Sequence, residues 1–138
     1  MILPVSATVA AICAIMLLIT AVDTVRQRMR LGAAFGDRGD AALVSSSRAH
    51  GNLAEHAPIV ILMLAFLELA HASHAGLVAV GALFVVGRAA HIVGLYAPVD
   101  TKPPLPRSIG VIATWLVMLV LSGWTLWTVL AGGAGATA

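Results

Sequence analysis

The stretch Arg48-Ala49-His50-Gly51-Asn52-Leu53-Ala54-Glu55 runs directly into the apolar segment 57–67, and it decides how the chain must fold. On a helix, Arg48, Asn52 and Glu55 fall within an arc of roughly 60°, so they form one polar stripe. The apolar segment has eleven residues, whereas a bilayer span takes about 20. A membrane-spanning helix here must therefore include the stripe. Ionisable side chains at membrane depth are costly and usually mark a functional site.

The composition is that of an integral membrane protein. Of the 138 residues, 60% are hydrophobic and only 10% are charged, and the mean hydropathy is +1.00. An ordinary globular domain is about 45–50% apolar and about 25% charged. The formal net charge of +2 is too small to suggest nucleic-acid binding.

The cysteine and histidine residues do not predict a metal site. Cys13 is the single cysteine, so an intramolecular disulfide is excluded, and its apolar surroundings indicate a packing role. His71 and His74 have helical spacing, but beside Glu68 they are better explained as interfacial residues than as zinc ligands. No metal is expected.

Four apolar segments predict four membrane-spanning helices, over about residues 3–25, 42–70, 75–96 and 107–131. The first segment lacks the basic start of a signal peptide, so we interpret it as a retained span. Several glycines among the bulky aliphatic residues of the third segment would let helices approach closely. The prolines within 97–106 mark a loop. The expected fold is an all-α, integral membrane four-helix bundle forming a single domain over residues 1–138.

The distribution of basic residues predicts the orientation of the chain in the membrane. The loops near 23–47 and 97–106 fall on one side of a four-span protein and carry the Lys and Arg residues outside the spans. The positive-inside rule places these loops in the cytoplasm and both termini outside. This topology brings four polar clusters to the cytoplasmic half of the membrane, namely residues 26–30, residues 48–55, Arg88 with His91, and Arg107.

A site with several arginines, one asparagine and one acid suits an anionic ligand, because the arginine guanidinium binds carboxylates through paired hydrogen bonds. A structural alternative remains open: Arg48, Glu55, Arg88 and His91 could form ion pairs and hydrogen bonds that only hold neighbouring helices together. His91 lies three residues after Arg88 and hence on its face, where a histidine more commonly packs than acts as a base.

The motifs resemble those of the MAPEG family, the membrane-associated proteins in eicosanoid and glutathione metabolism, and particularly its short bacterial members. The resemblance covers about residues 5–130 and rests on the segments Val25-Arg26-Gln27-Arg28, Gly36-Asp37-Arg38-Gly39-Asp40, the RAHGNLAEHAP run at 48–58, and Gly87-Arg88-Ala89-Ala90-His91. It implies a homotrimer of four-helix protomers, in a bacterial inner membrane, with glutathione bound between protomers near the cytoplasmic face.

The resemblance also implies roles for individual residues. Glutathione-binding positions are matched by Arg26, Arg48, Asn52, Glu55, Arg88 and His91. Arg107 looks like the arginine that the family places beside the glutathione sulfur, and it is the candidate catalytic residue. A free thiol has a pKa near 8.5, so an adjacent guanidinium would raise the reactive thiolate fraction at neutral pH.

The sequence departs from the family pattern at two positions on helices, and the second of them weakens an assignment as a specific eicosanoid synthase. The family tyrosine seven residues after Arg88 is replaced by Leu95, with Tyr96 one step further on, and Gly51 replaces a basic residue that some eicosanoid-forming members carry. The expected function is a membrane-bound, glutathione-dependent transferase or peroxidase acting on small hydrophobic electrophiles, with glutathione as co-substrate.

Two other classes of protein remain. The alternative is a non-catalytic membrane protein that binds glutathione or a lipid-like anion on the same fold. A transporter or channel subunit is less well supported, because no span shows the paired Gly/Pro breaks of midplane transport sites. The expected partners are further copies of the chain, membrane lipid and a hydrophobic substrate.

Overall fold

The computed structural model describes residues 2–98 and 102–135, which form four helices: α1 (Pro4–Leu31), α2 (Ala41–Leu69), α3 (His74–Tyr96) and α4 (Leu105–Gly135). All four are long and apolar enough to cross a membrane. The predicted all-α, four-span membrane protein is therefore confirmed.

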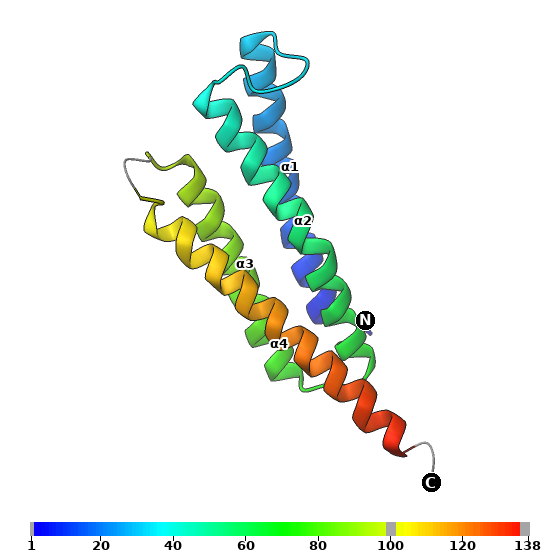
Figure 1. Cartoon of the computed structure of the whole chain (residues 1–138). Helices are drawn as coiled ribbons and strands as arrows, with labels where there is room; N and C mark the ends of the chain where they lie inside the picture. Colours follow the sequence, from blue (N-terminus) through cyan, green and yellow to red (C-terminus); the bar gives the residue numbers. More distant parts are fainter. Residues whose placement is uncertain (1, 99–101, 136–138) are drawn as a thin grey trace.

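The helices pair as two antiparallel hairpins, α1 with α2 and α3 with α4 (Figure 1). Helix α2 contacts both α3 and α4, whereas α1 and α4 do not touch in the described part of the chain. Both termini and the α2–α3 turn lie at one end, and the two longer connections lie at the other (Figure 1). The hairpins diverge toward the end with the longer connections.

The core lies where the hairpins converge. Leu53, Ala57, Val60, Leu64 and Leu67 of α2 are at most 2% exposed, and their alternating spacing of four and three residues forms one helix face. Cys13 belongs to the same buried cluster, which confirms its predicted packing role. Large apolar side chains also cover the outside of all four helices, as expected where lipid is the solvent.

Helices α3 and α4 approach closely at glycines, as the small-residue pattern predicted. A Cβ on Gly87 would lie 2.9 Å from the Cβ of Ala113, and one on Gly110 would lie 2.5 Å from the carbonyl oxygen of Gly87. A Cβ on Gly94 would meet the backbone of Arg107. The start of α4 is therefore held directly against the end of α3.

The first helix is longer than predicted. It ends at Leu31 rather than near residue 25, and Gly32 closes it in the left-handed conformation with φ of 58°. Hydropathy marks only where a helix leaves the hydrocarbon, whereas arginine, glutamine and methionine are good helix formers in water. The basic residues 26–30 consequently lie on a helical extension of the span. Helix α4 starts at Leu105, two residues before the predicted start.

Candidate functional site

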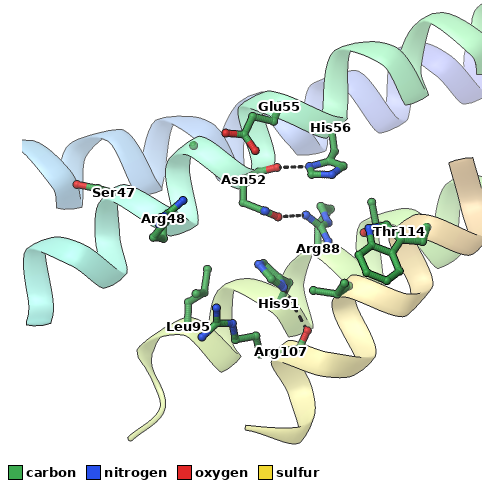
Figure 2. A pocket seen from close by; sticks show the side chains of 13 residues that line it. Ser47, Arg48, Asn52, Glu55, His56, Arg88, His91, Leu95, Arg107 and Thr114 are labelled. Atoms are coloured by element: carbon green, nitrogen blue, oxygen red, sulfur yellow. Dashed lines mark hydrogen bonds between the residues drawn. The ribbon is translucent and has the colours of Figure 1, made fainter. Parts of the chain in front are cut away.

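A cavity of about 600 Å³ lies between α2 and the α3–α4 hairpin (Figure 2). This volume is within the usual range of about 300–1,000 Å³ for small-molecule sites. The cavity is lined by Ser47, Arg48, Gly51, Asn52, Glu55, His56, Arg88, His91, Leu95, Arg107, Val111, Thr114 and Trp115. Six of the seven residues predicted for the site are thus brought together, and their roles stay predictions.

Helix α2 supplies the polar stripe. Arg48, Asn52 and Glu55 all line the cavity, as their shared helix face requires. Asn52 is half-buried and its side-chain oxygen points at α3, whereas Arg48 and Glu55 are exposed in the single chain (Figure 2). His56 lies one turn after Asn52 and donates from Nδ1 to the Asn52 carbonyl oxygen at 2.8 Å.

Arg88 is the most deeply buried charged residue of the cavity, with 2% of its surface exposed. Its Nη1 donates to Asn52 Oδ1 at 2.5 Å and its Nη2 donates to the Gly110 carbonyl oxygen at 2.9 Å, so it joins α3 to both α2 and α4 (Figure 2). The guanidinium carbon also lies 5.9 Å from the ring centroid of Phe84, within cation–π range.

No carboxylate neutralises Arg88 within the described residues. The one ion pair there, between Arg30 and Asp40, lies outside the cavity, and the buried Nε of Arg88 has no hydrogen-bond partner. A buried charge without an opposite charge is costly. The guanidinium therefore leaves the cavity with an uncompensated positive charge.

His91 lies one turn after Arg88, with 4% of its surface exposed. Its Nδ1 lies 3.2 Å from the carbonyl oxygen of Arg107. This contact ties α3 to the first turn of α4 and fixes the direction of the imidazole (Figure 2). Arg107 itself is half-buried and lines the cavity.

Arg26 is the predicted site residue that does not line the cavity. It is exposed on α1, and α1 packs on α2 and α3 without touching α4. The neighbouring basic residues have structural contacts: Arg28 donates to carbonyl groups of the following loop, and Arg38 donates to the carbonyl groups of Leu31 and Gly32. The predicted depth of the basic residues in the membrane did not identify which of them reach the cavity.

The structure shows where the two residues near the family tyrosine position lie. Leu95 lines the cavity, whereas the Tyr96 hydroxyl donates to Asp23 on α1 at 2.6 Å. Tyr96 thus serves as a link between helices.

Several lining residues were not predicted as site residues, among them His56, Thr114 and Trp115. His56 could have been found from its position one turn after Asn52. Thr114 is 1% exposed and donates to the Gly110 carbonyl oxygen that also binds Arg88. Trp115 lines the cavity yet is 65% exposed, so it forms the rim. Uncharged residues of an apolar helix give no pattern that separates a cavity wall from a lipid face.

The structure contains a contact of the kind that the structural alternative expects. The Arg88–Asn52 hydrogen bond does join two helices. Arg48 and Glu55, however, form no ion pair with each other or with any other described residue. Helix packing alone therefore does not account for the charges on the open side of the cavity.

The fold and the cavity define a class: a membrane protein of four spans with an arginine-rich cavity inside the helices. The chain belongs to the MAPEG family, whose profile matches residues 6–127. It is 33% identical over 123 residues to the inner membrane protein YecN of Escherichia coli K12, and equally so to the protein of that name in strain CFT073. The match covers 89% of this chain and 91% of each relative. No solved structure matches the chain.

These comparisons confirm the family and, together with the four spans, the predicted integral membrane location. The cytoplasmic placement of the two longer connections stays a prediction from the positive-inside rule.

Proposed function

We propose that the chain is a membrane-bound glutathione transferase or peroxidase, in which the cavity between α2, α3 and α4 binds glutathione. The observation that carries this proposal is the buried, uncompensated charge of Arg88. A ligand carboxylate would supply the missing negative charge. Family membership supports the choice of glutathione, because the family acts in eicosanoid and glutathione metabolism.

The charges of the cavity fit the charges of glutathione. The tripeptide carries two carboxylates, one ammonium group and one thiol, and the cavity offers three arginines and one glutamate: Arg48, Arg88, Arg107 and Glu55. We assign Arg48 and Arg88 to the carboxylates and Glu55 to the ammonium group, with the Asn52 amide and His91 as further polar contacts. Each charge of the ligand then meets an opposite charge.

Arg107 is assigned to the thiol. It lines the cavity at the start of α4, on the same helix as the rim residue Trp115. Eight residues of helix separate the two side chains by about 12 Å along the axis. The cavity thus combines a polar end for the tripeptide with an apolar rim from which a hydrophobic electrophile, dissolved in the lipid, would reach the sulfur.

We further propose that the working unit is a homotrimer whose neighbouring protomers close the cavity. Arg48 and Glu55 are exposed charges on a membrane-spanning helix, and a second protomer packed there would shield them from lipid. Arg26, which lies outside the cavity of its own chain, would contact glutathione from the adjacent protomer.

Ligand binding tests the central assignment. Glutathione should bind detergent-solubilised protein, and its diethyl ester, which lacks both carboxylates, should bind at least 10-fold more weakly because each lost charge-assisted hydrogen bond costs about 1.5–3 kcal/mol. Equal affinity for the two compounds would contradict the assignment of Arg48 and Arg88.

Turnover separates the enzyme from the non-catalytic alternative. Conjugation of glutathione to an aryl halide and reduction of a lipophilic hydroperoxide should both be measured on the same preparation. Tight glutathione binding without either reaction would favour a non-catalytic binding protein.

Light scattering in detergent tests the assembly. Three chains per particle are expected. A stable monomer that binds glutathione as tightly as the trimer does would show that no second protomer contributes to the site.

A further inference from the structure

We propose that His91 is the general base of the reaction, accepting the thiol proton of glutathione at Nε2. This inference rests on the proposed function and adds to it the destination of the proton. Arg107 can stabilise a thiolate, but its guanidinium is already protonated and cannot accept a proton. The cavity therefore needs a second group for the proton transfer.

The hydrogen bond of His91 sets its tautomer. Nδ1 lies 3.2 Å from the Arg107 carbonyl oxygen, which can only accept a hydrogen bond. Nδ1 must therefore carry the ring hydrogen, and in the neutral ring Nε2 is left without one. Such a bond to a backbone carbonyl is a common way to direct the second nitrogen of a histidine toward its task.

Few of the other side chains around the cavity could act as the base in place of His91. Arg88 lies on its own helix, Arg48, Glu55 and His56 line the cavity from α2, and Arg107 lines it from α4. Histidine is the side chain whose ordinary pKa lies between pH 5 and 8. The two histidines that line the cavity, His56 and His91, are therefore the candidate bases.

The position of His91 favours it over His56. The Nδ1 of His56 is bound to the Asn52 carbonyl oxygen of its own helix, so His56 has no link to the residue assigned to the sulfur. His91 is bound to the backbone of Arg107. Both residues also line the cavity, so a sulfur held by the Arg107 guanidinium would share the cavity with His91.

The proton transfer balances without another reactant. The S–H bond breaks, its electron pair stays on sulfur, and the proton forms a bond to Nε2, giving a thiolate and an imidazolium. The thiolate then forms an S–C bond as the leaving-group bond of the electrophile breaks; the leaving group departs with that electron pair, and the imidazolium gives its proton to water. With an epoxide substrate, the imidazolium returns the proton to the alkoxide oxygen that the ring opening creates.

Proton counting tests the inference on the unmodified protein. Thiolate formation is followed by its ultraviolet absorbance, and proton release by a pH indicator, during binding of glutathione and of S-methylglutathione at pH 7. S-methylglutathione has no thiol proton. The difference in proton release between the two ligands, called the extra release, therefore reports the fate of the thiol proton alone. If the protein keeps the proton, the extra release per thiolate is close to zero. A value close to one would overturn the inference.

Variants identify the acceptor. In His91→Gln, the extra proton release per thiolate should rise toward one, and turnover should fall about 100-fold or more. The ionisation of the base should also disappear from the pH profile of kcat/KM. His50→Gln is the matched control, because His50 contacts Thr20 and does not line the cavity. If the proton is still retained in His91→Gln, another group is the base.

The two proposals can fail separately. Absence of glutathione binding to the wild-type chain would overturn the proposed function and this inference with it. Binding and turnover that persist unchanged in His91→Gln would overturn the inference alone.

Discussion

The Tyr96 hydroxyl donates a hydrogen bond of 2.6 Å to Oδ2 of Asp23 and so joins the last residue of α3 to α1. This bond connects the two hairpins near the end where they diverge (Figure 1). Tyr96→Phe removes the bond and little else. We expect the free energy of unfolding to fall by about 1 kcal/mol while turnover stays near the wild-type value, measured by thermal unfolding and aryl halide conjugation. A large loss of turnover at unchanged stability would place the hydroxyl in the reaction.

Residues assigned to the charged ends of glutathione should affect affinity. Arg48→Ala and Glu55→Ala each remove one charge-assisted contact, which costs about 1.5–3 kcal/mol and weakens binding about 10- to 150-fold. Titration calorimetry measures the dissociation constant. Arg30→Ala is the control, because Arg30 pairs with Asp40 outside the cavity. An unchanged affinity in Arg48→Ala and Glu55→Ala would remove the α2 stripe from the site.

Arg107 should affect the reacting thiol more than it affects binding. Arg107→Ala should lower turnover and raise the pKa of bound glutathione, because the thiolate loses its neighbouring positive charge, while affinity stays closer to the wild-type value. Thiolate absorbance against pH measures the shift. Arg107→Lys should restore part of the effect, since it returns the charge without the planar guanidinium. Near-wild-type turnover in Arg107→Ala would contradict the assigned role.

Glu68 should stabilise the fold at the opposite end of the helices. Its carboxylate accepts hydrogen bonds from the backbone N–H groups of Val5 and Ser6 at 2.8 and 2.9 Å, and from the Ser6 hydroxyl at 2.5 Å. It thus caps α1 from the end of α2. Glu68→Ala should lower the free energy of unfolding by about 1–3 kcal/mol, whereas Ser6→Ala should have a smaller effect. Equal melting temperatures for Glu68→Ala and wild type would contradict the cap.

The Asp40 carboxylate should make the stability of the fold depend on pH. The backbone N–H of Leu43 and the Arg30 guanidinium hold the pKa of the Asp40 carboxyl below its ordinary value. A carboxyl with a lowered folded pKa stabilises the fold above its unfolded pKa of about 3.9, and the contribution is lost as the pH falls through the folded value. The melting temperature of Asp40→Ala should therefore lie below that of wild type at pH 7, and the difference should shrink in acid.

The control for this measurement is Asp37→Ala, which removes a carboxylate from the same loop and leaves the cap of α2 in place. A difference between Asp40→Ala and wild type that stays constant from pH 7 into acid would contradict the charged cap.

The sequence predicted the four spans and most of the cavity because charged residues stand out in apolar segments. Arg48, Asn52 and Glu55 share a helix face, and the antiparallel order of the spans brings Arg88, His91 and Arg107 to the same depth. A shared polar site was therefore expected from the helix periodicity together with the order of the spans, and these residues line one cavity.

Other features could not be predicted for identifiable reasons. Depth along a helix does not give the direction in which a side chain points. The resemblance assigned Arg26 to glutathione, and in the single chain this residue lies on the exposed surface of α1, so its role stays a prediction. The role of Arg88 as a link between three helices depends on the Gly110 carbonyl oxygen, and backbone acceptors have no sequence signature. Trp115 resembled any other lipid-facing aromatic residue.

The exposed indole of Trp115 at the rim of the cavity has a consequence for kinetics. A substrate that reaches this rim is dissolved in hydrocarbon, so its concentration there follows the partition coefficient and the volume of the lipid phase. Diluting the protein with more lipid would then raise the apparent KM for a hydrophobic electrophile when it is expressed per volume of water. The apparent KM for water-soluble glutathione would not change.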